Sequence, residues 1–211
     1  MNIASMIDHT LLRADAREDD IRALCAEALK SGFYSVCVNG CWVPLCADIL
    51  CDSAVKVCCV VGFPLGAMSS EAKAFEAALA VKEGADEIDM VVNIGRLKQG
   101  DLEYVRRDIA AVCAAVSPAA VKVILETCLL TEDEIISACR CAEEGGAAFV
   151  KTSTGFSSGG ATEQAVALMR RCVGDRLGVK ASGGIRTHET ALAMIKAGAS
   201  RIGASAGEKL L

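Results

Sequence analysis

Residues 144–156 read EGGAAFVKTSTGF, and this stretch holds the three local signals that decide the fold. The glycine pair follows an Ala- and Glu-rich segment, and a glycine is common where a helix ends in a left-handed residue. The apolar run that follows predicts a short buried strand. The Thr-Ser-Thr-Gly after it predicts a loop. A helix, a strand and a polar loop therefore succeed one another here.

The same order recurs along the whole chain. A glycine precedes a strand at Gly32-Phe33, Gly84-Ala85, Gly146-Ala147 and Gly198-Ala199. A second pattern, Val-Lys followed by Val or Ala, opens the intervening strands at Val55-Lys56, Val121-Lys122 and Val179-Lys180. These patterns mark seven strands, at residues 35–39, 56–62, 87–93, 122–126, 149–153, 178–182 and 200–204, and a short apolar stretch at 7–8 is read as the first of eight.

The predicted strands are nearly all apolar, which is typical of a parallel sheet with both faces covered. Strand then helix, eight times over, predicts a compact (β/α)8 TIM barrel that forms a single domain over residues 1–211. Helices are expected at 71–83, 102–116 and 132–144, the last with a capping box formed by Thr131 and Glu134. An open doubly wound sheet is the alternative, but the GxGxxG signature that often opens such a sheet is absent.

The composition excludes several classes of protein. Apolar residues make up 53% of the 211 residues, and 22 basic against 27 acidic side chains give a net charge of −5. This balance argues against a nucleic-acid surface. No stretch of 18 apolar residues and no secretion signal is visible, so we expect a cytoplasmic protein with no membrane partner. The sequence does not distinguish a homodimer from a monomer.

Twelve cysteines form no pattern that points to a metal or to disulfides. No C-x-x-C pair occurs, only two histidines are present, and the chain is large for a disulfide framework. We therefore expect no metal site and no cofactor, and we interpret cysteine here as a small apolar residue. The cysteines are Cys25, Cys37, Cys41, Cys46, Cys51, Cys58, Cys59, Cys113, Cys128, Cys139, Cys141 and Cys172.

Small polar residues follow the last three strands, where a TIM barrel carries its active site. Strand six runs into Thr152–Gly155, strand seven into Ser182-Gly183-Gly184, and strand eight into Gly203-Ala204-Ser205. Glycine lets backbone N–H groups approach an anion, and the loops after strands seven and eight are the usual phosphate cradle of this fold. A phosphate site is favoured over simple tight turns because both of these loops share the pattern.

Two lysines and an aspartate stand out in apolar strands. Lys151 lies in Phe149-Val150-Lys151-Thr152, and a lysine is rarely buried unless it is paired or reactive. Asp89, in the strand at 87–93, is either its structural ion-pair partner or part of the same site. Lys180 aligns with Lys56 and Lys122 at the inert ends of strands, yet it also lies close to Gly183. Position alone does not decide its role.

Other polar residues at strand ends could line the mouth of the barrel. Asp8 and Thr10 end strand one, and Glu126 ends strand five. His9 lies beside the first two, and His188 begins a predicted helix, where we expect it at the surface. A single histidine is more often a local hydrogen-bonding residue than a catalyst, so neither receives a chemical role.

Five segments of the chain resemble the deoxyribose-phosphate aldolase family. They are Phe149–Phe156 (FVKTSTGF), Val179–Arg186 (VKASGGIR), Glu87–Gly95 (EIDMVVNIG), Ile7–Leu12 (IDHTLL) and Val60–Gly66 (VVGFPLG). The resemblance spans almost the whole chain. It implies a class I aldolase on a (β/α)8 barrel that joins acetaldehyde to D-glyceraldehyde 3-phosphate and cleaves 2-deoxy-D-ribose 5-phosphate in the catabolism of deoxyribonucleotides and pentoses.

The resemblance also implies roles for individual residues. Lys151 would form the Schiff base, which requires an uncharged amine. Lys180 would supply a positive charge beside it, and Asp89 would act as general acid and base through a water. Residues expected to contact the substrate or its phosphate are Gly155, Gly183, Gly184, Gly203, Ser205, Asp8, Thr10 and Cys37.

The chain departs from the family pattern at three places. The family usually reads Cys-Val-Asn-Pro where this chain has Cys37-Val38-Asn39-Gly40, and it often has two serines where Ser205-Ala206 stands. The segment after strand eight is short, so the last helix of the barrel is nearly absent. Two other functions stay open: a different phosphate-binding aldolase or isomerase, and a regulatory sugar-phosphate-binding barrel without activity.

Overall fold

The computed structural model describes residues 2–211, and its centre is a closed barrel of eight parallel strands in chain order. Every strand pairs with the next, and β8 pairs with β1 to close the ring. The predicted TIM barrel is confirmed. The strands are β1 (Ile7–Leu11), β2 (Ser35–Val38), β3 (Lys56–Val61), β4 (Glu87–Val91), β5 (Ala120–Ile124), β6 (Phe149–Lys151), β7 (Gly178–Ser182) and β8 (Arg201–Ala204).

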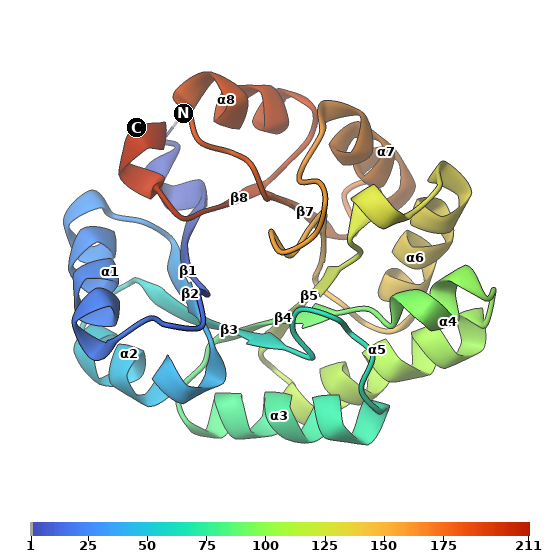
Figure 1. Ribbon diagram of the computed structural model, residues 1–211, viewed down its shortest axis with the longest axis horizontal. Coiled ribbons are helices and arrows are strands. Elements are labelled where there is room, and N and C mark those ends of the chain that lie inside the picture. The colour runs from blue at the N-terminus through green and yellow to red at the C-terminus, as the bar shows by residue number, and fades with distance from the viewer. Residues whose placement is uncertain (1) are drawn as a thin grey trace.

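The helices form a ring outside the barrel, as Figure 1 shows. They are α1 (Glu18–Ser31), α2 (Val43–Leu50), α3 (Ser70–Lys82), α4 (Ile94–Lys98), α5 (Leu102–Val116), α6 (Glu132–Glu144), α7 (Glu163–Val173) and α8 (His188–Lys196). Short 3-10 helices lie at η1 (Ala4–Met6), η2 (Gly40–Trp42), η3 (Thr127–Leu129) and η4 (Gly207–Leu210). Only η4 follows β8 within the described residues, as expected, and the barrel closes nonetheless.

Local sequence signals place the elements well. The helices α5 and α6 have the predicted bounds, and the capping box of Thr131 and Glu134 is present. All four glycines of the repeat have positive φ, from 66° at Gly32 to 116° at Gly198. The prediction for β1 was too short, since the strand runs to Leu11. The prediction for β5 was two residues too late, because this strand ends at Ile124 before the chain turns.

Alternate strand residues face the helices or the inside of the barrel, because successive side chains in a strand point to opposite faces. On β3, Val57, Cys59 and Val61 pack in the large apolar layer between strands and helices. Cys58 and Val60 point inward and form a small inner apolar cluster with Leu12 and Cys37. This cluster fills the side of the barrel made by β1–β3.

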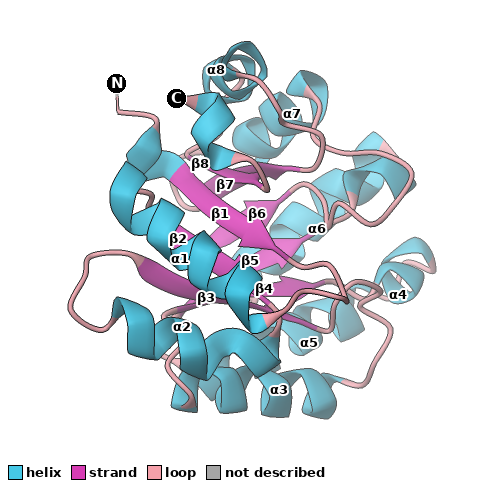
Figure 2. Ribbon diagram, turned by 60° about the vertical axis from the view of Figure 1, so that its left-hand side comes forward, coloured by secondary structure: helices cyan, strands magenta, loops and turns pink. Residues whose placement is uncertain are grey.

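In the turned view of Figure 2 the strands run through the middle of the molecule and the helices surround them. Among residues 2–211, none of the helices combines the length and apolar character that a membrane span requires.

Candidate active site

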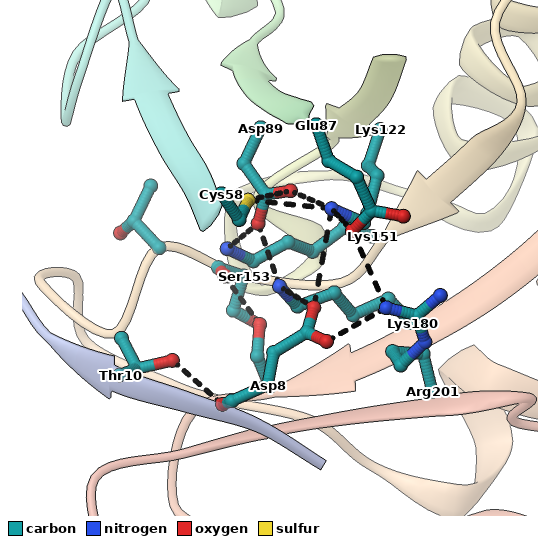
Figure 3. Close-up of polar contacts among 12 residues, drawn as sticks. Asp8, Thr10, Cys58, Glu87, Asp89, Lys122, Lys151, Ser153, Lys180 and Arg201 are labelled. Atoms are coloured by element: carbon teal, nitrogen blue, oxygen red, sulfur yellow. Dashed lines mark hydrogen bonds and ion pairs between the residues drawn. The ribbon is translucent and has the colours of Figure 1, made fainter. Parts of the chain in front are cut away.

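The rest of the barrel interior is charged rather than apolar. Seven charged side chains, each at most 5% exposed, lie inside the barrel and come from six strands. Figure 3 shows them converging from opposite sides. Charged groups are seldom buried unless they are paired, so this layer must neutralise itself internally. Its members are Asp8, Glu87, Asp89, Lys122, Lys151, Lys180 and Arg201.

Asp89 is the centre of this layer. Its Oδ2 accepts hydrogen bonds from Nζ of Lys151 and from Nζ of Lys180, both at 2.7 Å. Its Oδ1 lies 2.8 Å from Nζ of Lys122. Two lysine nitrogens that share one oxygen lie at most twice 2.7 Å apart, so Lys151 and Lys180 are close neighbours.

A second carboxylate, that of Asp8, also pairs with Lys180. Asp8 Oδ2 lies 2.5 Å from Nζ of Lys180, and Asp8 Oδ1 accepts from Arg201 at 2.8 Å. Glu87 joins the remaining cations, at 2.7 Å from Lys122 and 3.3 Å from Arg201. The ion pairs therefore form one connected network rather than separate bridges.

The network keeps its carboxylates ionised. Burial by itself would raise the pKa of Asp89, but attraction to Lys122, Lys151 and Lys180 outweighs burial and holds this pKa well below its ordinary value. The pKa of Asp8 falls to about 2 for the same reason, with Lys180 as its largest attractive partner. Asp89 is therefore ionised at neutral pH and pairs with the surrounding ammonium groups.

The same attraction keeps Lys180 charged. Burial would lower the pKa of Lys180, but Asp8 and Asp89 outweigh burial and raise it above the ordinary lysine value. The pKa of Lys122 is also raised: burial would lower it, but attraction to Asp89 and other neighbours outweighs burial. Lys180 is thus an ammonium next to Lys151 before substrate binds.

A cavity of about 320 Å³ opens directly above this network. Its floor includes Lys151, which is the one lysine of the network that reaches the wall of the cavity. Its sides are built by loops that follow β1, β6, β7 and β8. The arrangement offers a small molecule a pocket that Lys151 helps to line.

Comparison with known proteins assigns the chain to a family. The model of the DeoC/LacD family aldolases matches residues 3–210. The chain belongs to this aldolase family. It is 60% identical over 210 residues to deoxyribose-phosphate aldolase 1 of Bacillus licheniformis, covering 99% of this chain and 94% of the relative. It is 58% identical to the deoxyribose-phosphate aldolase of Thermoanaerobacter sp., covering 100% of this chain and 96% of the relative.

The fold agrees with that of a solved relative. The structure matches the tetrameric deoxyribose phosphate aldolase of Aeropyrum pernix with a TM-score of 0.92 and 34% identity, covering 99% of this chain and 88% of that one. The resemblance noted in the sequence is thereby confirmed at the level of the family, and the chain is an aldolase.

The aldolase structure divides the residues expected at the site into two groups. One group lines the cavity: Lys151, Thr10, Gly155, Gly183, Gly184, Gly203 and Ser205. The other group, namely Asp89, Lys180, Asp8 and Cys37, is fully buried and does not line it. Of these, Asp89, Lys180 and Asp8 belong to the charged network, whereas Cys37 lies in the inner apolar cluster.

The structure places Lys180 inside the barrel, and the expectation that Lys122 lies at an inert strand end was wrong. Both were aligned with Lys56 at strand starts, but only Lys56 is exposed there, paired with Asp86 at 3.1 Å. Lys122 and Lys180 are the third residues of β5 and β7, whereas Lys56 is the first residue of β3, so the same sequence pattern reaches different depths in the barrel. Gly203 helps to make the room, since a Cβ on it would lie 3.1 Å from Cε of Lys180.

Sequence reasoning missed four further residues. Glu87 and Arg201 complete the network, and the signal was a charged residue at the first position of β4 and of β8. Arg13 and Arg186 line the cavity from loops. Arg13 pairs with Asp15 and with Asp20, whereas no carboxylate among residues 2–211 pairs with Arg186.

One group of residues in the described part of the chain has donor atoms close enough for a metal ion. These atoms, from Cys37, Cys58 and Asp89, lie within 4.8 Å of one another. However, Cys58 Sγ donates to Asp89 at 3.1 Å, and both oxygens of Asp89 already bind ammonium groups. A cation here would lie against three lysines, so the donor set is a poor fit for a metal.

Proposed function

We propose that this aldolase reversibly cleaves 2-deoxy-D-ribose 5-phosphate to D-glyceraldehyde 3-phosphate and acetaldehyde through a Schiff base on Lys151. The observation that carries the proposal is the position of Lys151, which lines the cavity and whose amine lies 2.7 Å from Asp89. The names of the relatives support the substrate, which would make the enzyme part of deoxyribonucleotide and pentose catabolism.

The charge on Lys180 has a chemical purpose in this mechanism. At about 5 Å and an effective dielectric of about 20, two positive charges repel by roughly 3 kcal/mol. An ammonium on Lys180 therefore favours an uncharged, nucleophilic amine on Lys151. Asp89 accepts hydrogen bonds from Nζ of Lys151 and of Lys180, and so fixes the distance between the two nitrogens and their orientation.

Bond formation starts at the aldehyde carbon of the open-chain sugar. The neutral amine of Lys151 adds to C1, and a proton moves from nitrogen to oxygen to give a carbinolamine. Lys180 donates a proton to the carbinolamine hydroxyl by way of Asp89 and an intervening water, and a water molecule leaves as the iminium forms. Lys180 is then an uncharged base.

The iminium draws electrons from the neighbouring carbon–carbon bond. Lys180 accepts the proton of the C3 hydroxyl, the C2–C3 bond breaks, and glyceraldehyde 3-phosphate departs. The enamine left on Lys151 takes this proton at C2. Water then adds to the new iminium and loses a proton to Lys180, and acetaldehyde leaves the regenerated amine. Protons and electrons balance within the residues named, so the cycle consumes no cofactor.

Backbone groups at the other side of the cavity suit the phosphate. Gly155, Gly184 and Ser205 line it from three loops, and among residues 2–211 their N–H groups donate to no protein acceptor. Free N–H groups in glycine-rich loops are favourable partners for an anion. Arg186 adds a positive charge on the same wall.

Reductive trapping tests the proposal. The protein is incubated with acetaldehyde or with 2-deoxyribose 5-phosphate, reduced with sodium borohydride, and mapped by mass spectrometry. We expect one adduct, on Lys151, and release of glyceraldehyde 3-phosphate in an untrapped sample. An adduct on Lys180, or none with either compound, would contradict the proposal, and an adduct with only another aldehyde would favour a different aldolase.

A further inference from the structure

Glu126, directly beyond β5, has an unusual backbone. It is the one non-glycine residue in the described chain with positive φ, at φ 59° and ψ 60°. A residue with a side chain adopts this left-handed conformation only where the surroundings impose it, and such residues cluster at functional sites. The cause is therefore to be sought in the contacts of Glu126.

The backbone hydrogen bonds between the segment after β5 and the segment after β6 change register at Glu126. The N–H of Leu125 donates to the carbonyl of Lys151, and the N–H of Thr127 donates to the carbonyl of Thr152, both at 2.9 Å. In regular parallel pairing both chains advance by two residues between such bonds. Here one advances by two and the other by one, so Glu126 is the extra residue of a bulge, a device that redirects a side chain.

The redirected side chain of Glu126 accepts hydrogen bonds from Thr154. Glu126 is 2% exposed, and its two oxygens lie 3.3 and 3.4 Å from the backbone N of Thr154. The hydroxyl of Thr154 also donates to Oε2 of Glu126, and it accepts the N–H of Phe156 at 3.0 Å. One carboxylate thus fixes the first turn of the loop after β6.

Gly155 lies inside this turn, with φ 86°, and lines the cavity. The far end of the same loop is tied to the loop after β7, where the N–H of Ala161 donates to the carbonyl of Gly183 at 3.0 Å. The near end depends on Glu126. The wall on which the proposed phosphate site is built is therefore preorganised from both ends.

We propose that Glu126 is a positioning residue that determines the preference for a phosphorylated substrate by holding Thr154–Phe156 in place. The inference rests on the proposed function for the identity of the substrate. Donors held in place before binding need no ordering when the anion arrives. Without the carboxylate, the loop must be ordered by the phosphate itself, so affinity for the phosphate falls while the chemistry at Lys151 continues.

Two variants separate the carboxylate from the backbone conformation. Glu126→Gly suits positive φ but removes the carboxylate. Glu126→Gln keeps the size of the side chain, but its amide offers one acceptor in place of two and carries the test if the glycine variant does not fold. Glu132→Gln, at the exposed start of α6, is the control for loss of a nearby negative charge.

Cleavage kinetics with 2-deoxyribose 5-phosphate and with 2-deoxyribose give the result. Loss of a hydrogen bond to a charged group corresponds to about 10- to 100-fold in affinity. We expect KM for the phosphorylated sugar to rise by that factor in Glu126→Gly and by less in Glu126→Gln. The KM for 2-deoxyribose and kcat should change by less than about threefold, and Glu132→Gln should match the unmodified protein.

Titration with inorganic phosphate provides a readout that does not need turnover. Its Kd should rise in parallel with KM in the two Glu126 variants. If both KM values shift together, or if Kd for phosphate is unchanged in a folded variant, Glu126 has only a structural role. If the unmodified protein cleaves neither sugar, the proposed function fails, and the phosphate titration still decides whether Glu126 organises an anion site.

Discussion

Two regions of the molecule bury a lysine against an aspartate, and only one of them opens on a cavity. Outside the barrel, Lys73 of α3 lies 2.6 Å from Asp108 of α5, and both side chains are fully buried. Inside the barrel, Lys151 lies 2.7 Å from Asp89. By burial and distance alone the two pairs are nearly the same.

They differ in how charge is shared. Lys73 has one carboxylate and the carbonyl of Val91, at 3.0 Å, and burial lowers its pKa despite the pull of Asp108. Asp89 instead serves three lysines at once. The isolated ion pair of Lys73 and Asp108 stabilises the packing of two helices. Asp89, which pairs with three lysines, instead keeps several amino groups close together beside a pocket. Burial of a lysine is therefore weak evidence for chemistry unless its amine reaches a cavity.

The largest expected effect is at Lys151. Lys151→Arg keeps the positive charge, but a guanidinium stays protonated and cannot attack a carbonyl. We expect the borohydride adduct to disappear and aldol cleavage to fall by about 10⁴-fold or more. Thermal unfolding should confirm that the variant is folded, and appreciable residual turnover would place the nucleophile elsewhere.

A smaller loss is expected at Lys180. Lys180→Leu removes a charge worth roughly 3 kcal/mol, so cleavage at neutral pH should slow by about 100-fold. Activity should recover in part as pH rises, because Schiff-base formation requires an uncharged amine. Lys180→Arg retains the charge but cannot give up its proton, so its pH profile should keep the original shape while its maximal turnover stays low. A pH profile in Lys180→Leu that matches the unmodified protein would make the second lysine structural.

The outer pair should affect stability rather than catalysis. Lys73→Met leaves Asp108 buried without its partner, and we expect the free energy of unfolding to fall by about 3–5 kcal/mol. Lys73→Met combined with Asp108→Leu should recover much of this loss, since no charge is left unpaired. In both variants kcat of the folded protein should stay within about threefold of the original. A large drop in kcat at full folding would erase the distinction between the two pairs.

Acid should weaken the inner network through its carboxylates. The pKa of Asp8 in the folded state is about 2, below its ordinary value of 3.8. Its contribution to stability, about 2 kcal/mol, is therefore present above pH ~4 and is lost as pH falls toward ~2. Urea unfolding from pH 2 to pH 5 should show a shallower slope for Asp8→Asn than for the unmodified protein. Asp19→Asn, at the exposed start of α1, should leave the slope unchanged.

Much of this protein could be predicted from local sequence. Glycine before each even-numbered strand and apolar runs between amphipathic segments are local signals that repeat along the chain. Because each of them depends only on nearby residues, their repetition predicts the barrel. Lys151 and Asp89 could be singled out because a charged residue in an apolar strand is conspicuous. The phosphate loops follow from glycines at strand ends, a position with a known role in this fold.

The sequence by itself therefore determined the order of the elements, the closed barrel and the strands that carry the site. Tertiary structure alone decided which lysines meet, since Lys56, Lys122 and Lys180 share one local pattern but lie at different positions in their strands. It also decided that Lys73 is paired away from any pocket and that Glu126 turns back onto Thr154. Contacts between residues distant in the chain depend on the register of neighbouring strands, and a period-2 pattern records which face a side chain takes but not which partner it finds there.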